Sequence, residues 1–558
     1  YILAGDIDAG VTNTWNRTSN GIKGFLPIGE DYSKTFKGRF DGVGHTITRL
    51  HIRRENVGTL GLFGYVTTAR IENLSLVDGD VEGNYSVGGI VGYAEDTVIR
   101  NVSYAGSVVG KHEVGGIVGY AWGGSIQNAW NAGAVRGTIQ SAGGIVGYAR
   151  EAAKIQNVCN TGTVTTVQEN AGGIVGGITN STLQHAWNTG TVAGSMNVGG
   201  IVGVADGGTV RHAVSKAGSA GQAVGASSNG TDVTDVKVAP EADMKLAATY
   251  TDWKDANGTA LVATEGGKGT PWRIYEGHTM PLLTALMKGT KRLAKVYDGN
   301  VFATTDPHIT LVHTGKDVGT YDAYSDQLGY DLIGGAVIKP RALTIGAVAA
   351  QSKTYDGTTA ADISKFHATL NNVVSGEESL VTATATGATY NSKDVRAANT
   401  VNYTGVALGG TGAGNYTLAA STAQGAGSIT AKQLNLALTS GARFDKTYDG
   451  NANVTQSLAQ GTHYNLTGFV GSEGTGIALA SSTGTYSDKN AAADKTVTFN
   501  GLTLTGAGAG NYTLDKTTLT GTGTITKRAL TLGAVAAQTK TYDGTTAADT
   551  AKISAVLN

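Results

Sequence analysis

The chain is built from two internal repeats with different periods. A block that reads Val-Gly-Gly-Ile-Val-Gly-Tyr in its clearest copy recurs with spacings of 28, 27, 28, 29 and 27 residues. Its six copies start at Thr59, Val87, Val114, Ala142, Ala171 and Val198. A period of this length predicts a solenoid, in which each unit buries its apolar face only against its neighbours.

The second repeat is the tripeptide Tyr-Asp-Gly. It occurs at Tyr297, Tyr355, Tyr448 and Tyr542, and the last three copies are separated by 93 and 94 residues. A period of this length is the size of a small independent domain. The two repeats together predict an all-β protein: a parallel β-helix followed by a tandem array of small β domains, arranged as an elongated rod.

Composition supports ordered β structure. Glycine accounts for 83 of the 558 residues, whereas proline accounts for only 6, which fits many tight turns between short strands. The formal net charge is −1, so no electrostatic case exists for binding nucleic acid or an anionic membrane. We expect no membrane insertion, because no apolar run is long enough to span a bilayer. The chain begins and ends inside its repeats, which we interpret as an excerpt of a longer protein.

Aligned copies of the first repeat show columns that a β-helix would stack. The glycine column predicts corners or close backbone approach, and its members are Gly88, Gly115, Gly143 and Gly172. The aliphatic column predicts the interior, and its members are Ile71, Ile99, Ile126, Ile155, Leu183 and Val210. Asparagines two residues later predict an amide ladder along the axis, and they are Asn73, Asn101, Asn128 and Asn157.

Several side chains in these columns invite a functional interpretation. His185 and His212 could bind a metal, but they occupy the ladder positions and no third ligand recurs beside them. Cys159 shares a column with Trp130 and Trp187. Counting with period two from the aliphatic column places this column on the interior face, so we expect buried core residues and not a nucleophile or a sugar-stacking platform. Trp122 lies in a variable turn, and we predict that it is the exposed aromatic residue and a possible ligand contact.

The repeats also predict domain boundaries. The β-helix with its six repeats covers residues 1–215, and a Gly/Ala/Ser-rich stretch (217–230) breaks its register. Residues 216–290 form a linker and a cap that protects the end of the solenoid. A short Tyr-Asp-Gly domain (291–340), two full ones (341–432 and 433–527) and the start of another (528–558) follow. The last segment matches residues 341–371 at 24 of 31 positions.

The Tyr-Asp-Gly copies carry a phenol and a carboxylate and could form a site. Their repetition favours a structural turn, with the tyrosine in the core and the aspartate capping backbone amides. The residues of the two full copies are Tyr355, Asp356, Gly357, Tyr448, Asp449 and Gly450. Because the closing strand of one copy runs directly into the first strand of the next, we expect stiff junctions.

No sequence motif of a known enzyme class is present, and we predict no catalytic, cofactor or metal site. Polysaccharide-degrading β-helices need clustered carboxylates on adjacent rungs. Glu95, Arg150 and Glu151 are scattered, and no acidic column persists. Asp78 and Asp80 lie in one turn that could bind calcium or nothing.

The Gly-Gly-Ile-Val-Gly repeat resembles the GLUG motif of bacterial surface proteins. The segments KTYDGTTAA (353–361), GAGNYTL (412–418) and their later copies resemble YDG-type domains. Both occur together in filamentous-haemagglutinin-like adhesins of Gram-negative bacteria, which are exported by two-partner secretion. The resemblance implies a β-helical exoprotein at the outer membrane, an outer-membrane transporter as export partner, and attachment to a host surface receptor or to the biofilm matrix.

Three functions stay open at this point. The β-helix is a binding module for an extracellular glycan or host receptor, presented on a stalk of β domains. Alternatively, the chain is a passive spacer, or the β-helix binds matrix exopolysaccharide and crosslinks cells. An exposed aromatic or acidic groove on the flank of the β-helix would favour polysaccharide binding, whereas a uniform Thr/Asn/Gly flank would favour the spacer.

Overall fold

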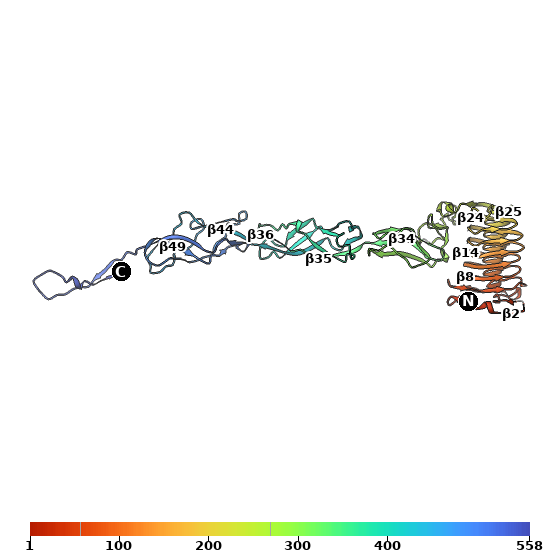
Figure 1. Ribbon diagram of the computed structural model, residues 1–558, viewed down its shortest axis with the longest axis horizontal. Coiled ribbons are helices and arrows are strands. Elements are labelled where there is room, and N and C mark those ends of the chain that lie inside the picture. Colours follow the sequence, from red (N-terminus) through yellow and green to blue (C-terminus); the bar gives the residue numbers. More distant parts are fainter. Residues whose placement is uncertain (20, 56, 268) are drawn as a thin grey trace. The chain divides into compact units, whose positions relative to one another are not determined.

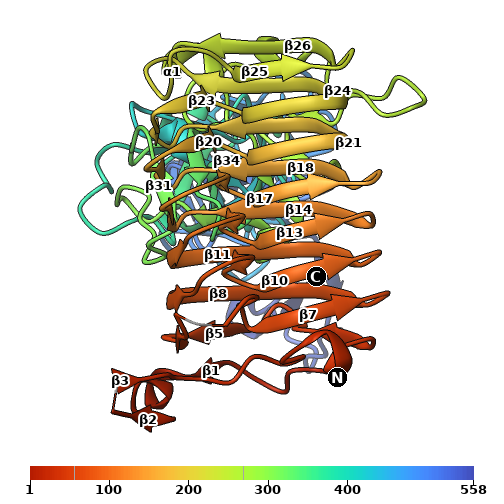
Figure 2. The same ribbon diagram turned by 90° about the vertical axis from the view of Figure 1, so that its right-hand side faces the viewer.

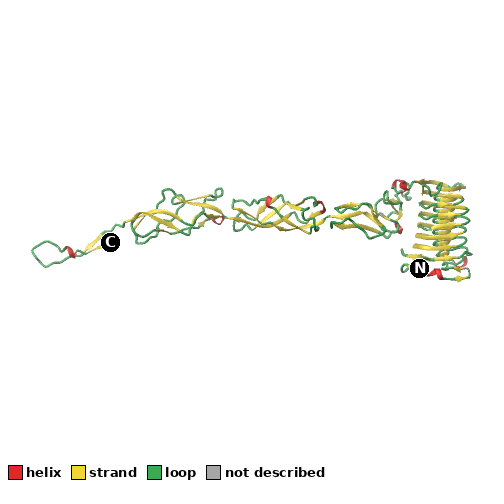
Figure 3. Cartoon of the chain, in the orientation of Figure 1, coloured by secondary structure: helices red, strands yellow, loops and turns green. Residues whose placement is uncertain are grey.

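A computed structural model describes residues 1–19, 21–55, 57–267 and 269–558. The chain forms two compact units, Tyr1–Lys339 and Pro340–Asn558. Strands dominate both units, as expected from the sequence (Figure 3), and the one α-helix in the described residues is the four-residue α1 (Glu241–Met244).

The first unit contains the predicted β-solenoid, whose rungs stack as parallel strands (Figures 1 and 2). One face stacks β7 (Phe63–Thr67), β10 (Val91–Glu95), β13 (Val118–Trp122) and β17 (Val146–Arg150). A second face stacks β8 (Arg70–Glu82), β11 (Val98–Gly110), β14 (Ser125–Asn131), β18 (Lys154–Asn160), β21 (Val175–Asn188) and β24 (Val202–Lys216). The third face continues from β8 and β11 into β15 (Ala134–Gly137), β19 (Val164–Thr166) and β22 (Val192–Ala193).

The short strands of the glycine column form a separate sheet at one corner. They are β9 (Val87–Gly88), β12 (Val114–Gly115), β16 (Ala142–Gly143), β20 (Glu169–Gly172) and β23 (Met196–Gly199). A Cβ on Gly115 would lie 1.9 Å from the carbonyl oxygen of Val118 in the same corner. Only glycine therefore fits this position.

One apolar core runs through the solenoid. The aliphatic column is in register from Ile71 to Val210, and all six of its side chains are at most 3% exposed. Folding removes the apolar surface of these side chains from water. Its burial is the main contribution to the stability of the solenoid. The inward side chains of each rung are buried only because they contact the side chains of the rungs beside it.

The asparagine of each rung changes which face the following residues point to. Asn128 has a left-handed backbone with φ of 53°, so the strict alternation of a strand is interrupted there. Ile126 and Ala129 point inward, and Trp130 points outward. Our placement of the tryptophan column in the interior was therefore wrong, because period-two counting does not hold across a left-handed residue.

Residues 240–287 cover this outward column. Cys159 and Trp187 are 0% and 4% exposed, and they pack in one cluster with Trp253 and Trp272 of the covering segment. The Nε1 of Trp187 donates to the carbonyl oxygen of Pro281 at 2.9 Å. Burial raises the pKa of the Cys159 thiol. The cysteine is thus a buried residue of a second core outside the solenoid.

The solenoid extends one rung further than we expected. The strands β25 (Val224–Ser228) and β26 (Asp232–Ala239) pair in parallel with β24, so the Gly/Ala/Ser-rich stretch does not end the stack. Residues 240–287 pack against the flank of several rungs, where Cys159, Trp187 and Val214 lie. The expected linker and cap at 216–290 are therefore a final rung followed by a flank-covering segment.

Residues 240–287 contact a small β unit that belongs to the same compact unit, Tyr1–Lys339. The flank-covering segment contains η3 (Ala247–Tyr250), β27 (Val262–Ala263), β28 (Trp272–Arg273), β29 (Leu282–Leu283) and η4 (Thr284–Leu286). Strands β30 (Thr290–Val296), β31 (Ile309–Leu311), β32 (Gly319–Tyr321), β33 (Ala323–Ser325) and β34 (Asp331–Lys339) follow. Arg273 and Asp331 are buried and form an ion pair at 3.2 Å between the two parts.

The second unit contains two copies of one topology. In the first copy, β35 (Arg341–Val348) lies between β37 (Ala368–Asn371) and β42 (Tyr416–Leu418). A four-stranded sheet joins β36 (Gln351–Thr354), β43 (Thr422–Thr430), β40 (Thr400–Thr404) and β39 (Gly387–Tyr390), and β38 (Thr382–Thr384) pairs with β41 (Ala407–Gly409).

The second copy repeats this order. Strand β44 (Lys432–Leu438) lies between β46 (Tyr464–Thr467) and β51 (Tyr512–Leu514). The larger sheet joins β45 (Lys446–Thr447), β52 (Leu519–Thr526), β49 (Ala492–Phe499) and β48 (Gly484–Tyr486), and β47 (Ala478–Leu479) pairs with β50 (Leu504–Thr505). Beyond it, β53 (Leu532–Val535) and β54 (Ala555–Leu557) form an antiparallel pair.

Candidate functional site

A ladder of asparagine amides runs along the outer flank of the second solenoid face. The Nδ2 of Asn101 donates to Asn73 Oδ1 at 2.8 Å, and that of Asn128 donates to Asn101 Oδ1 at 2.9 Å. Each of these residues has a left-handed φ of 53° or 54°, which asparagine tolerates better than most residues. The ladder bonds that we expected for Asn101 and Asn128 are present. Asn157 instead accepts a hydrogen bond from the indole of Trp272 at 3.2 Å.

The start of this ladder lines a polar groove of about 500 Å³. Asp41, the last residue of β4 (Arg39–Asp41), forms part of one wall. Ala285 and Leu286 of η4, with Met287 and Lys288, form the opposite wall. The lining residues are Asp41, Val43, Gly44, Asn73, Leu74, Ser75, Asn101, Ala285, Leu286, Met287 and Lys288. The groove, named here the flank groove, therefore places amides and a carboxylate opposite an apolar strip and a lysine.

Asp41 is the ionised end of the ladder. Its Oδ1 accepts from the Nδ2 of Asn73 and from the backbone N of Val43, both at 2.9 Å. The hydrogen bond from Asn73, with that from Val43 and the charge of Arg39, holds the pKa of this carboxyl below its usual range. The carboxylate therefore stays charged and hydrogen-bonded at neutral pH.

A cluster of arginines around Glu72 supports the same rungs. The Glu72 side chain is 0% exposed, and the Nε atoms of Arg39, Arg70 and Arg100 lie 2.6, 2.8 and 2.6 Å from its oxygens. Burial alone would raise the pKa of Glu72, but the hydrogen bonds from the three guanidinium groups outweigh it and lower the pKa. Since all its bonds are internal, this carboxylate holds rungs together and is not a general acid or base.

The polar groups of the flank groove are of the kind that hydrogen-bond hydroxyl groups. A side-chain amide has two N–H donors and two acceptor lone pairs, so Asn73 and Asn101 each keep one of each after bonding their neighbours. The hydroxyls of Ser75 and Ser103 are bonded to each other at 2.8 Å and continue the polar surface. Acid–base hydrolysis of a glycoside needs two carboxyl groups. The groove lining contains one, Asp41.

His185 and His212 are parts of the ladder column. Their rings stack with centroids 5.3 Å apart, and His185 also packs against Trp253 at 5.7 Å. Their φ angles are 54° and 51°, as at the asparagine positions. Burial, followed by the charge of His212, lowers the pKa of His185 to about 4. Within the described residues, no group of three His, Cys, Asp or Glu side chains could hold a metal ion.

Trp122 belongs to a second surface, a column of tyrosines on the first solenoid face. The ring centroids of Tyr120 lie 5.3 and 5.8 Å from those of Tyr93 and Tyr148, and all three rings are nearly parallel. Trp122 is the last residue of β13, not a turn residue, and it stacks on Tyr120 at 6.5 Å. It is 36% exposed, and a ligand contact there stays a prediction. Because the tyrosine rings stack on one another, they present mainly edges to solvent.

In both full copies, the Tyr-Asp-Gly turn is hydrogen-bonded to a lysine that lies two residues before the tyrosine. The Nζ of Lys353 donates to Asp356 Oδ1 at 2.7 Å and to the carbonyl oxygen of Ala360 at 2.9 Å. Asp356 also accepts from the backbone N of Thr358 at 2.9 Å, and Gly357 has a left-handed φ of 78°. Lys446, Asp449 and Gly450 repeat this arrangement in the next copy. The sequence analysis assigned no role to the lysine, although its fixed spacing was visible.

A second amide ladder lies inside the solenoid and was also missed. Asn131, Asn160 and Asn188 are 0% exposed. Their Nδ2 atoms donate along the axis at 2.7 and 2.8 Å, and Asn188 donates onward to the hydroxyl of Ser219 at 2.7 Å. Each also bonds the backbone of the glycine two residues later, for example Gly162. The recurrent Asn-X-Gly at the end of these rungs was the available signal.

Comparisons with known proteins agree with these repeats. Residues 339–424 and 430–519 match the YDG domain family, and residues 83–109 match the GLUG motif. A stretch of 112 residues is 41% identical to halomucin of Haloquadratum walsbyi. That stretch is 19% of this chain and 1% of halomucin, so the chain spans a very small part of this curated relative.

A solved structure of an immunoglobulin A1 protease candidate from Bacteroides ovatus is similar over 46% of this chain and 84% of that chain, at 18% identity and a TM-score of 0.35. In the described residues, no helix has the length and apolar character needed to cross a membrane.

Proposed function

We propose that this chain is part of an extracellular surface adhesin whose β-solenoid binds an extended polysaccharide or cell-surface glycan. The observation that carries the proposal is the flank groove, in which ladder amides and Asp41 face the apolar side chains of Leu286 and Met287. Sugar rings offer hydroxyl groups to amides and apolar C–H faces to aliphatic side chains. A groove with one polar and one apolar wall matches both.

The repeat families support a surface location. GLUG and YDG repeats in one chain, with similarity to part of halomucin, favour an exported surface protein over an intracellular one. We further propose export by two-partner secretion through an outer-membrane transporter and retention at a Gram-negative outer membrane. These two details rest on the resemblance to filamentous-haemagglutinin-like adhesins. The ligand would then belong to a host surface or to the biofilm matrix.

A passive spacer is the second candidate function. The stacked column of tyrosines and the internally paired Glu72 cluster favour it, because most polar and aromatic side chains on these faces already bond to neighbouring rungs. A passive spacer needs no binding groove. Binding of a glycan in the flank groove would therefore distinguish an adhesin from a spacer.

The test is a binding screen of the full chain against glycans and extracellular polysaccharides. A tryptophan at Ala285 fills the flank groove from its exposed wall, and we expect Ala285→Trp to weaken binding at least tenfold. Ala248→Trp is the matched control, since Ala248 is an exposed alanine on the other 3₁₀ helix of the same segment. Equal binding by both variants would exclude the groove, and absence of binding by the parent chain would favour the spacer.

A further inference from the structure

Within the second unit, the tyrosine of the first Tyr-Asp-Gly turn contacts the following domain. The Tyr355 side chain is 2% exposed, and its hydroxyl donates to the two carboxylate oxygens of Glu473 at 2.8 and 2.9 Å. Tyr512 donates to the same carboxylate at 2.6 Å, and the two rings meet edge to face at 5.4 Å. Hydrogen bonds to a charged acceptor are about twice as strong as neutral ones.

A second contact lies beside this one. The Nδ2 of Asn511 donates to Asp394 Oδ1 at 2.8 Å, and the backbone N of Val395 donates to Asn511 Oδ1 at 2.9 Å. Leu434 and Ile477, which are 0% and 2% exposed, fill the space beneath. The first copy therefore presents a receiving surface, and the second copy fills it with Glu473, Asn511 and Tyr512.

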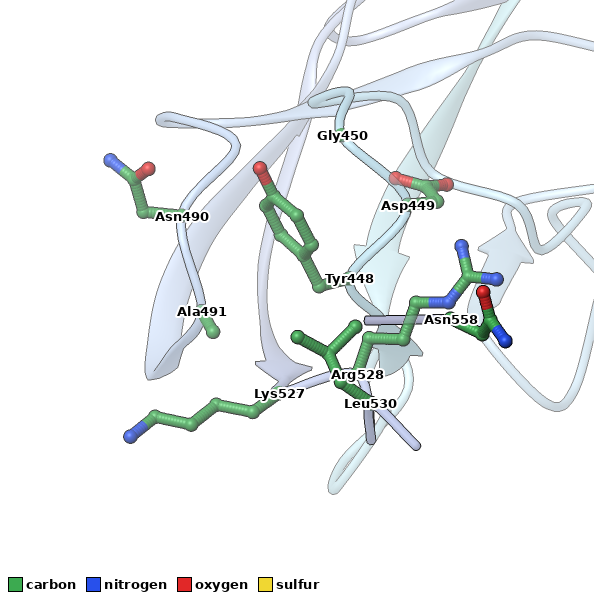
Figure 4. Close-up of a pocket in the computed structure, with 9 residues that line it drawn as sticks. All are labelled: Tyr448, Asp449, Gly450, Asn490, Ala491, Lys527, Arg528, Leu530 and Asn558. Carbon is green, nitrogen blue, oxygen red and sulfur yellow. The ribbon is translucent and has the colours of Figure 1, made fainter. Parts of the chain in front are cut away.

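The second copy presents the same receiving surface again. The repeat places Tyr448, Asn490, Ala491 and Leu530 where the first copy has Tyr355, Asp394, Val395 and Leu434. All four line one open pocket of about 740 Å³, and Figure 4 shows the Tyr448 ring between the Asn490–Ala491 turn and Leu530. Leu530 is 59% exposed, whereas its counterpart Leu434 is 0% exposed.

We propose that this pocket is a docking surface for a YDG-type domain joined directly after Lys527. The occupant presents the set Glu–Asn–Tyr, which the two copies carry as Glu377, Asn415, Tyr416 and as Glu473, Asn511, Tyr512. Tyr416 donates to Glu377 at 2.6 Å, the same bond that Tyr512 makes to Glu473, so both copies carry the inserting pair in one geometry.

Charge and chain direction agree with this occupant. Lys527 and Arg528 border the pocket and add positive charge to its rim, which favours an occupant that carries a carboxylate (Figure 4). In the filled junction, β43 and β44 are separated by one residue, and β44 pairs in parallel with the inserting strand β51. Residues 528–558 resemble the start of the first copy and follow β52 directly after Lys527, which takes the place of Ala431 in the repeat.

The test replaces residues 528–558 of the full chain by a second copy of residues 341–432, and follows Tyr448 by hydroxyl-radical labelling and mass spectrometry. We expect labelling of Tyr448 to fall about tenfold, to the level that Tyr355 shows in the parent chain, while the exposed Tyr85 labels equally in both chains. The substitutions Glu377→Ala and Tyr416→Phe, made only in the appended copy, should restore the labelling of Tyr448.

The two copies share the peptide that carries Tyr403, which is 1% exposed, so full protection of this peptide shows that the appended copy has folded as well. If that copy does not fold, residues 432–527 with Tyr448→Phe in the copy are appended instead, so that the peptides stay distinguishable. Unchanged labelling of the original Tyr448 beside a folded copy would overturn the proposal. Protection that survives removal of the glutamate and tyrosine would overturn it as well, because the docking would then not use the proposed set.

Discussion

The solenoid and the tandem domains both repeat a sequence, but the repeats cooperate in different ways. In the solenoid, one apolar core extends from Ala9 to Ala223, and each rung is completed by the rungs on either side. In the tandem domains, each copy has its own core cluster, and Leu434, Ile477 and Tyr512 of the second copy also pack into the cluster of the first. A change in one rung should therefore affect the whole stack, whereas a change in one domain should stay largely local.

The largest effect is expected from the glycines that stack at the corner between the second and third faces, which include Gly133 and Gly162. A Cβ on Gly162 would lie 1.9 Å from the carbonyl oxygen of Gly133 on the next rung. Gly162→Ala should lower the free energy of unfolding of the solenoid by more than about 3 kcal/mol, because backbone must move. Urea unfolding followed by tryptophan fluorescence measures this, since all six tryptophans lie at or before Trp272.

The matched substitution in the tandem domains is Gly414→Ala. A Cβ there meets nothing within 4 Å, so we expect a change within about 0.5 kcal/mol. Similar losses for the two variants would show that the rungs are not held at the close spacing described here.

Acid should weaken the solenoid through His185. Its pKa is about 4 in the folded chain and 6.5 when exposed, so the stability it contributes is complete above pH 6.5 and is lost as the pH falls through 4. The expected loss between pH 7 and pH 4 is about 3 kcal/mol. His185→Asn restores the residue type of the ladder column and should remove this part of the acid response.

Denaturant unfolding followed by tryptophan fluorescence at a series of pH values checks the effect, with the parent chain as the reference. An unchanged pH profile in His185→Asn would mean that the histidine is solvated in the folded protein.

Removal of one amide from the buried ladder should cost less. Asn160→Ala takes an acceptor from Asn131, a donor from Asn188 and a backbone partner from Gly162. Leaving such groups without partners costs about 2 kcal/mol. Asn402→Ala, which breaks an exposed side-chain pair with Gln424 at 2.8 Å in the tandem domains, is the control and should change stability by less than about 0.5 kcal/mol.

The smallest effect is expected at the domain junction. Tyr355→Phe removes the hydroxyl bonded to Glu473 and should reduce the coupling between the two domains by about 1 kcal/mol. Tyr448→Phe, at the open counterpart of this surface, should have no measurable effect. Calorimetry of the two variants measures the coupling, and equal effects would contradict the asymmetry between the filled and the open surface.

The sequence predicted the repeat architecture well, because stacking imposes columns that can be read directly. Ile126 and its counterparts were placed correctly in the interior. Trp130 and Trp187 were not, since the left-handed Asn128 and His185 shift the alternation by one residue. That shift is a backbone property, and only the asparagine column pointed to it.

Contacts between distant segments could not be predicted. The flank groove needs Ala285 and Met287 beside Asn73, and no local pattern brings residues so far apart in sequence together. The role of Tyr355 was also out of reach, because the same Tyr-Asp-Gly turn is compatible with a tyrosine inside its own domain or against the next one.

The buried ladder of Asn131, Asn160 and Asn188 has a consequence for how such a protein can change in length. The amide of Asn160 donates to an identical amide and accepts from another, so the rung that carries it is complementary to a copy of itself. Duplication of such a rung in the gene inserts a new layer whose polar groups are satisfied at once, without compensating substitutions elsewhere. Solenoids of this kind can therefore lengthen or shorten between generations by whole rungs while their cross-section stays the same.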